Sequence, residues 1–186
     1  MSVLETSRLR LRPFTVADAV DHARIYAKPA VTRFLAGGPF LGVAAAQRSR
    51  AALDLFIGHW VEHGFGVWAV VDKRTHVLIG QCGLQYLPDR PEVEILYALD
   101  TPYWGQGLAG EAAEAALRHG FEMAHLERIV AVARPEHGAS RRVMAKLGMA
   151  YDGLVEIYGI RAVLYAVSRE EFRRRTTSAS SAGGNA

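Results

Sequence analysis

One turn constrains the fold of this 186-residue chain more than any other segment. It joins an apolar run at residues 92–99, which is predicted as a strand, to an Ala/Glu-rich run at residues 108–124, which is predicted as a helix. The turn contains Gly105 and Gly107, and Gly110 follows within the first helical turn. Backbone N–H groups at such a helix start have no partner within the helix, and together with the helix dipole they suit a phosphate group. We therefore expect an anionic ligand to bind where this strand meets this helix.

Two other interpretations of the turn stay open. The spacing Gly105-x-Gly107-x-x-Gly110 formally matches the dinucleotide fingerprint G-x-G-x-x-G. The turn lies past mid-chain, however, and Arg134 rather than an acidic residue follows the next predicted strand. A P-loop is excluded because no Gly-Lys-Ser/Thr follows. The glycines can also serve only close packing at a helix start, as in many proteins.

The rest of the chain predicts an α+β fold with a mixed, mostly antiparallel sheet of about seven strands flanked by helices. Hydrophobic periodicity and turn residues place strands at 8–13, 66–71, 77–87, 92–99, 128–133, 149–157 and 161–167, and helices at 15–27, 44–63, 108–124, 137–147 and 169–175. We expect one domain over residues 1–175. Residues 176–186 have no large apolar side chain, which predicts a disordered tail.

Composition excludes several classes of protein. The 22 Lys+Arg against 19 Asp+Glu leave a formal charge of +3, too small an excess to indicate a nucleic-acid partner. Cys82 is the single cysteine, which rules out an internal disulfide and a Cys-rich zinc site. His59 and His63 have helical spacing for a metal, but no third ligand is evident, so no metal is expected. No signal peptide and no apolar run of membrane-spanning length are present, so we expect a cytoplasmic protein with no membrane partner.

The turn and its surroundings resemble the GCN5-related N-acetyltransferases. The pyrophosphate loop of that family has the sequence motif Q/R-x-x-G-x-G/A. In this chain, Trp104, Gly107 and Ala109 stand at the three defined positions. Residues 134–149 are similar to the family's fourth-helix motif, and residues 6–14 look like the start of its ribosomal-protein (Rim-type) branch. The resemblance implies the family fold, in which the fourth and fifth strands splay apart around acetyl-coenzyme A.

The resemblance also implies which residues hold the coenzyme. The pantetheine arm would bind along the strand edge and the pyrophosphate on the turn, while His137 stands where the family has an Asn that contacts coenzyme A. Carried over to this chain, the coenzyme-binding residues are Tyr97, Ala98, Leu99, Trp104, Gly105, Gln106, Gly107, Leu108, Ala109, Gly110, His137, Ser140 and Arg142. No metal cofactor is implied.

Two residues are the predicted catalytic groups. Glu94 lies in an otherwise apolar strand, where partial burial would raise its pKa into the range of a general base. It can equally lie on a wet strand face or in a salt bridge. Family members often carry a Tyr as the leaving-group acid at the position of Met144, so Ser140 is the predicted donor to the leaving sulfur, unless it only caps or packs the helix. Other hydroxyl donors without a motif are Tyr97, Tyr158 and Tyr165.

The predicted function is an N-acetyltransferase that moves an acetyl group from acetyl-coenzyme A directly to a primary amine, either a peptide N-terminus or a small molecule. A coenzyme A-binding module without chemistry is the alternative, because Met144 replaces the usual Tyr. A homodimer is compatible with the family by analogy only. Polar residues expected to line the acceptor pocket are Arg24, Arg33, Asp152, Glu156, Tyr158 and Arg161.

Overall fold

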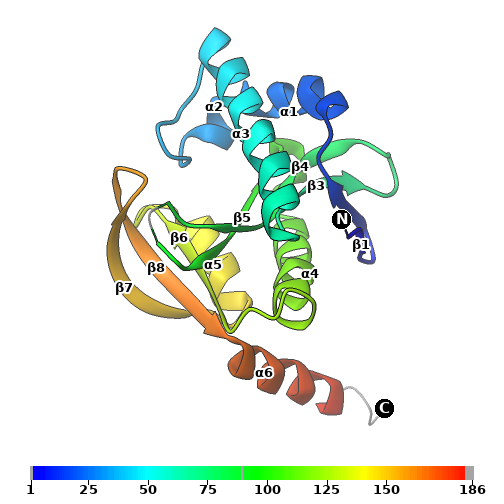
Figure 1. Cartoon of the computed structure of the whole chain (residues 1–186), viewed down its shortest axis with the longest axis vertical. Coiled ribbons are helices and arrows are strands. Elements are labelled where there is room, and N and C mark those ends of the chain that lie inside the picture. Colours follow the sequence, from blue (N-terminus) through cyan, green and yellow to red (C-terminus); the bar gives the residue numbers. More distant parts are fainter. Residues whose placement is uncertain (1, 89, 183–186) are drawn as a thin grey trace.

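The computed structural model describes residues 2–88 and 90–182 and contains one eight-stranded sheet, in the order β1-β2-β3-β4-β5-β6-β8-β7 (Figure 1). Every neighbouring pair of strands is antiparallel except β5 and β6. The strands are β1 (Leu4–Glu5), β2 (Leu9–Pro13), β3 (Val67–Asp72), β4 (Leu78–Tyr86), β5 (Val93–Leu99), β6 (Arg128–Ala133), β7 (Ala150–Ile157) and β8 (Ile160–Ser168). The predicted α+β class with a mixed, mostly antiparallel sheet is confirmed.

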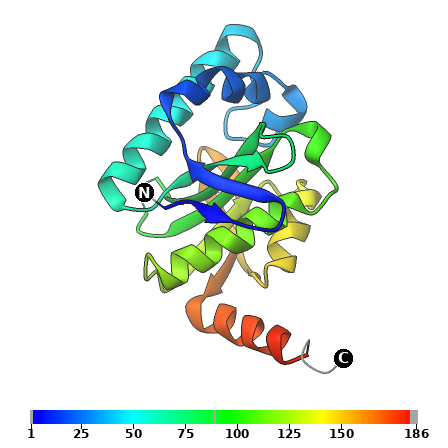
Figure 2. The ribbon, with the colours of Figure 1, turned by 90° about the vertical axis from the view of Figure 1, so that its right-hand side faces the viewer.

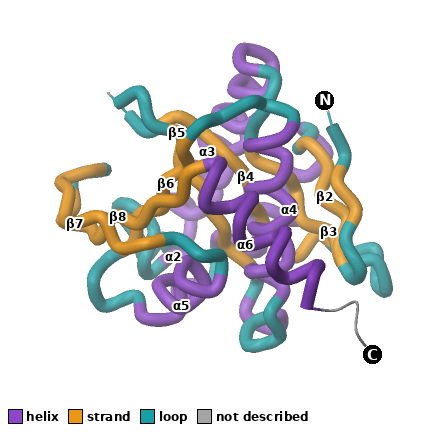
Figure 3. The backbone as a smooth tube through the Cα atoms, turned by 90° about the horizontal axis from the view of Figure 1, so that it is seen from below, coloured by secondary structure: helices purple, strands orange, loops and turns teal. Residues whose placement is uncertain are grey.

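Helices cover both faces of the sheet. They are α1 (Ala19–Tyr26), α2 (Pro29–Thr32), α3 (Gly42–His63), α4 (Leu108–Glu122), α5 (Gly138–Lys146) and α6 (Arg169–Ala182), with short 3-10 turns η1 (Val16–Asp18) and η2 (Thr101–Tyr103). Residues of α1, α2 and α3 form the core on one face, and residues of α4, α5 and α6 contribute to the core on the other. Seen from below, the β7–β8 hairpin lies at one end of the sheet and β2–β3 at the other (Figure 3).

The two cores follow from the period-2 pattern of the strands. In β3, Val67 and Ala69 pack with α1 and α3, whereas Trp68 and Val70 pack on the side of α4. All four side chains are fully buried. A strand covered by helices on both faces is apolar along its whole length, and this explains why residues 66–71 read as an uninterrupted apolar run.

The structure differs from the sequence-based expectation at both ends. A further strand, β1, pairs with β2 at the edge of the sheet, and its two residues are too few for a periodic pattern. At the C-terminus, α6 continues to Ala182 instead of ending at Arg175, so the tail predicted as disordered from residue 176 is helical through 182. Phe172 is buried in the main core and fixes the helix, and Thr176 and Thr177 donate to carbonyls one turn back. Residues 183–186 of the predicted tail lie outside the described part of the chain.

In the described ranges 2–88 and 90–182, we find no helix with the length and hydrophobicity needed to span a bilayer.

Candidate active site

The parallel strands β5 and β6 pair only at their start. Val93 is in register with Ile129 and Glu94 with Val130, and no further pair forms between the two strands. On its other side β5 stays paired with β4 as far as Leu99. The edge of β5 that faces β6 is therefore unpaired beyond Glu94, and the predicted divergence of these strands is confirmed.

The glycine-rich turn lies at the far end of β5. Gly105 and Gly107 have φ values of 74° and 78°, in the left-handed region that favours glycine, and Gly107 is the N-cap residue of α4. The first helical hydrogen bond runs from Glu111 to Gly107. Within the described part of the chain, no group accepts a hydrogen bond from the backbone N–H groups of residues 105–110. Six consecutive free donors and the start of a fifteen-residue helix make this turn suited to an anion.

The N-terminal strands hold this turn in place. The Arg8 guanidinium donates to the carbonyl of Gln106 at 3.0 Å and forms an ion pair of 2.6 Å with Glu111 in the first turn of α4. Thr6 and the Arg8 backbone also donate to Glu111, so the turn between β1 and β2 is fastened to the helix start. Figure 2 shows these strands lying beside α4. The pKa of Glu111 is held below its ordinary value by these donors, although burial opposes the shift.

Asp100 fastens the turn from the other side of the sheet. It is almost completely buried and accepts hydrogen bonds from Arg24 at 2.7 Å, from Lys28 at 2.5 Å and from the backbone of Thr101. Burial by itself raises the pKa of a carboxyl group, but Lys28 and Arg24 hold that of Asp100 below its usual value. The predicted acceptor residue Arg24 therefore connects α1 to the end of β5.

Trp104 stands at the position where the loop pattern has Gln or Arg. Its indole N–H donates to the carbonyl of Leu99 at 2.6 Å, and its ring is about half exposed. The indole therefore closes the turn onto the end of β5. Its exposed surface borders the turn in which a coenzyme contact was predicted.

Glu94 is buried at the point where β5 and β6 separate. Only 3% of its surface is exposed, and its Oε1 accepts hydrogen bonds from Gln85 Nε2 at 2.9 Å and from the Tyr158 hydroxyl. Burial raises the pKa of Glu94 to about 7, although the two hydrogen bonds lower it. The side chain is thus neither on a wet strand face nor in a salt bridge with a described residue. A carboxyl group in this state exchanges a proton near neutral pH.

Tyr97 on β5 and Ser140 on α5 are in contact. The Tyr97 hydroxyl lies 3.0 Å from the Ser140 hydroxyl and 3.1 Å from the Ser140 carbonyl, and Ser140 is buried in α5. Burial raises the pKa of Tyr97, so its phenol keeps its proton. Met144, one turn further along α5, is 1% exposed in the main core. The usual Tyr position is therefore filled by a packed thioether side chain.

His137 contacts the loop after α2, which is far away in the sequence. Its ring stacks on Phe34 with centroids 3.9 Å apart and planes at 16°, and the Arg33 guanidinium lies 4.5 Å from the Phe34 ring centre. Burial and the charge of Arg33 lower the pKa of His137. The residue predicted to contact coenzyme A thus also connects α5 to the loop after α2. Nothing in the sequence around Phe34 predicts this contact.

The basic residues near α5 differ in their partners. Arg142 is exposed, whereas Arg141 donates to the Tyr165 hydroxyl and the Pro135 carbonyl. Arg134 lies at the end of β6, and its buried Nε has no hydrogen-bond partner among the described residues. These side chains come from the segment that the sequence placed beside the coenzyme.

The predicted acceptor residues do not form one cluster. Asp152 pairs with Arg128 at the far end of β7, and Glu156 and Arg161 are exposed and opposite each other in the β7–β8 hairpin. Only Tyr158 contacts Glu94. Gln85, which sequence reasoning missed, lies directly opposite Glu94 in the β4–β5 register, so strand pairing is the signal that could have found it.

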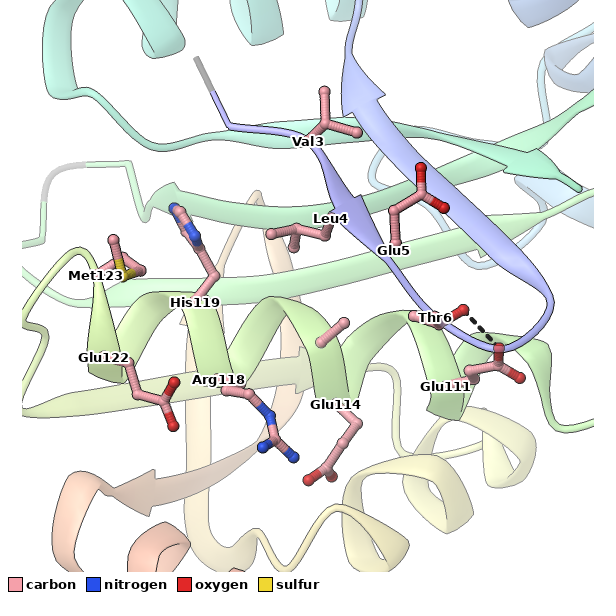
Figure 4. Close-up of a pocket in the computed structure, with 11 residues that line it drawn as sticks. Val3, Leu4, Glu5, Thr6, Glu111, Glu114, Arg118, His119, Glu122 and Met123 are labelled. Carbon is pink, nitrogen blue, oxygen red and sulfur yellow. Dashed lines mark hydrogen bonds between the residues drawn. The ribbon is translucent and has the colours of Figure 1, made fainter.

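A surface depression lies away from these residues. It lies between β1 and α4, has a volume of about 530 Å³, and is lined by Val3, Leu4, Glu5, Thr6, Glu111, Glu114, Ala115, Arg118, His119, Glu122 and Met123 (Figure 4). It includes none of the predicted catalytic or coenzyme-binding residues. The splay between β5 and β6, with its buried Glu94, is the better candidate site.

His59 and Cys82 have structural surroundings. His59 Nδ1 lies 2.8 Å from the Phe65 carbonyl, and His59 Nε2 accepts from the Tyr86 N–H, which fixes the neutral tautomer. Burial lowers the pKa of His59 and raises that of Cys82. Cys82 is a packed core residue, as the sequence predicted.

Comparison with known proteins identifies similar chains. Residues 8–150 match the family described as acetyltransferase (GNAT) domain. The uncharacterized N-acetyltransferase p20 of Bacillus licheniformis is 30% identical over 159 residues, which cover 85% of this chain and 88% of that protein. An acetyltransferase from Agrobacterium tumefaciens str. C58 superposes with a TM-score of 0.79 at 27% identity, covering 90% of this chain and 94% of that one. A ribosomal-protein-S5-alanine acetyltransferase from Vibrio fischeri has a TM-score of 0.71 at 23% identity, covering 92% and 99%, a likeness in fold.

Proposed function

Since this chain belongs to the GNAT family of acetyltransferases, we propose that it transfers an acetyl group from acetyl-coenzyme A to a primary amine. The single observation that carries the proposal is the buried Glu94, with its pKa near 7, at the point where β5 and β6 diverge. The acceptor is a peptide N-terminus or a small amine. An alanine-initiated peptide is the first to test, given the similar fold of the S5-alanine enzyme.

The free donors of the turn fit the pyrophosphate of acetyl-coenzyme A. Backbone N–H groups of residues 105–110 would hold its charged oxygens, and the left-handed glycines keep Cβ atoms out of the way. Arg8 holds the turn through the Gln106 carbonyl and so preserves this arrangement of donors. Arg134 and Arg142 supply positive charge on the neighbouring segment.

The unpaired edge of β5 fits the amide-containing pantetheine arm. Along Tyr97, Ala98 and Leu99, the backbone groups that point away from β4 face the splay, where β6 no longer pairs with β5. An extended ligand with amide groups can complete such an edge by main-chain hydrogen bonding. The coenzyme then lies between β5 and α5, with its reactive end near Glu94, Tyr97 and Ser140.

Acetyl-coenzyme A supplies the activated acyl group as a thioester. In the proposed direct transfer, the amine nitrogen forms the new bond to the acyl carbon and the carbon–sulfur bond breaks. Glu94 takes the proton that the amine loses, directly or through water. Ser140 donates a proton to the departing sulfur and takes one from the Tyr97 hydroxyl at 3.0 Å, which solvent then reprotonates. No acetyl-enzyme forms, and Cys82 is too deeply buried to act as a nucleophile.

A coenzyme A-binding module without chemistry is the second candidate. The observation that favours it is Met144, which is packed in the core where other family members carry a Tyr. The two candidates share the coenzyme site and differ only in turnover.

Calorimetry with acetyl-coenzyme A, followed by thiol release over a panel of amines, separates them. The panel contains an alanine-initiated hexapeptide, a serine-initiated hexapeptide and a small diamine, and acetylated products are identified by mass spectrometry. The proposal expects binding and product on at least one amine. Binding with no product on any amine favours the module, and an absence of binding contradicts both.

A further inference from the structure

The tip of the β7–β8 hairpin, at one end of the sheet, contacts Glu94 on the central strand β5. Ile157 pairs with Ile160, so Tyr158 and Gly159 form a two-residue turn. Their φ values are 54° and 70°, and a turn of this kind needs positive φ at both central residues. Asn and Gly suit such positions, whereas an aromatic residue is rare there. Tyr158 therefore stands where turn geometry alone would select a smaller residue.

The Tyr158 side chain uses this position to reach the buried carboxyl group. Its hydroxyl donates to Glu94 Oε1, and Gln85 Nε2 donates to the same oxygen at 2.9 Å. Gln85 Nε2 also lies 3.2 Å from the Tyr158 hydroxyl, so the three groups form a closed cluster from β4, β5 and the hairpin. Both donors converge on Oε1. Glu94 Oε2 accepts no hydrogen bond from any described residue.

The orientation of the Gln85 amide toward Glu94 leaves the other end of the amide without a hydrogen bond. Its Nε2 is used by Glu94 and Tyr158, while its own Oε1 is buried and has no partner within the described ranges. Buried polar atoms in native proteins are nearly always paired. A cluster that served only stability would not leave this acceptor unpaired, so its arrangement points to a role for the carboxyl group that it holds.

We propose that Tyr158 and Gln85 are positioning residues that hold Glu94 through Oε1 and leave Oε2 as the atom that takes the amine proton. This inference rests on the proposed function of Glu94 as the base. The hairpin that forms the far end of the sheet thus becomes part of the machinery for proton transfer. Among the described residues, the carboxyl accepts hydrogen bonds from Gln85 on β4 and Tyr158 in the hairpin, and Val130, its neighbour in register on β6, carries no charge.

The direct test is a carbon-13 NMR titration of the full chain labelled at the Glu side-chain carboxyl, with the Glu94 resonance assigned by its loss in Glu94→Gln. Removing a donor to the carboxylate raises its pKa, and a hydrogen bond to a charged group corresponds to a shift of about one pKa unit. We expect Tyr158→Phe and Gln85→Leu each to raise the Glu94 pKa by this amount. Tyr151→Phe is the matched control, because this exposed tyrosine of the same hairpin contacts Tyr165 and not Glu94.

Tyr158→Gly separates the carboxyl contact from the turn itself. Glycine suits the left-handed position but also removes the Tyr158 ring, which packs against the buried cluster that includes Ile157 and Leu164, and the Glu94 pKa should still shift as in Tyr158→Phe. An unshifted Glu94 pKa in both Tyr158 variants overturns the inference.

The acid limb of kcat/KM, measured with the panel amine that gives the fastest thiol release, should move with the NMR value. An NMR shift without a matching shift of the limb contradicts the proposed role of Glu94 itself. The failure of the inference and the failure of the proposed function therefore give different results.

Discussion

The two faces of β5 carry side chains of opposite chemistry near the point where β5 and β6 diverge. Side chains alternate along this seven-residue strand, so Glu94 lies on the face covered by α1 and α3, whereas Tyr97 lies on the face covered by α4 and α5. Glu94 is a carboxyl group whose raised pKa lets it accept a proton near pH 7. Tyr97 is a phenol that burial keeps protonated, and it contacts the Ser140 hydroxyl.

The difference shows how one strand can supply both an acceptor and a donor. Two acidic groups that share a site titrate as a pair, and neither then has an independent pKa. Here the pleat of the strand places them on opposite faces, and the pKa of Glu94 is set by burial and by its contacts with Tyr158 and Gln85. Proton uptake from the amine and proton donation to the sulfur can therefore be changed separately by mutation.

The largest expected effect comes from the face of β5 that carries Glu94, the proposed proton acceptor. Glu94→Gln keeps the shape of the side chain and removes the base, so kcat should fall by about 10²- to 10⁴-fold. Acetyl-coenzyme A affinity should change little, because the coenzyme is proposed to bind through the glycine-rich turn and the backbone edge of β5, and not through the Glu94 carboxyl. Steady-state kinetics and calorimetry measure the two quantities. An equal loss in both would show that Glu94 supports the fold or the coenzyme site.

Mutation of the glycine-rich turn should have the opposite effect: it should lower coenzyme affinity and leave kcat nearly unchanged. Gly107→Ala places a Cβ at φ 78°, which disfavours this backbone conformation by about 1–2 kcal/mol. The free turn should then relax, and restoring its left-handed conformation on binding should weaken acetyl-coenzyme A affinity by up to roughly 5- to 30-fold with little change in kcat. Gly58→Ala is the matched control, since this residue lies within α3, outside the coenzyme turn, and an added Cβ meets nothing within 4 Å. Equal weakening in the two variants would mean that the left-handed backbone of Gly107 does not matter for binding.

A mutation on the face of β5 that carries Tyr97, where Ser140 makes its contact, should lower kcat by less. Ser140→Ala removes the hydroxyl nearest to Tyr97, and kcat should fall on the order of tenfold, because the Tyr97 phenol stays available as a donor. The loss should be greatest with amines whose transfer is limited by departure of the sulfur. Ala139→Ser, on the exposed side of the same helix turn, is a control for changes in α5. Unchanged kcat in Ser140→Ala would assign Ser140 to packing alone.

The same comparison explains which parts of the site could be predicted from the sequence. Gly105 and Gly107 are local signals, because a strand, a left-handed turn and a helix start are encoded within a few residues. Glu94 was predictable as an acidic residue in an apolar strand. The residues that surround it were not, because Gln85 and Tyr158 reach it through strand register and a hairpin turn.

Long-range contacts account for the remaining differences. The stack of Phe34 on His137 joins segments about a hundred residues apart, and no local sequence pattern predicts this contact. Arg24 was expected at the acceptor site, but the buried Asp100 binds it instead. The end of α6 was missed because Ala, Ser and Thr are compatible with both a helix and a disordered tail.

The most direct test of the central claim is the pH dependence of kcat/KM for the wild-type chain with its fastest panel amine. Glu94 must be ionised to accept a proton, so the rate should rise with pH through about 7 and then level off as the carboxyl group loses its proton. The ionisation of the free amine is measured separately, and its contribution is divided out of the pH profile before the comparison. In Glu94→Gln the same limb should vanish. A limb near pH 7 that persists in Glu94→Gln would contradict the account.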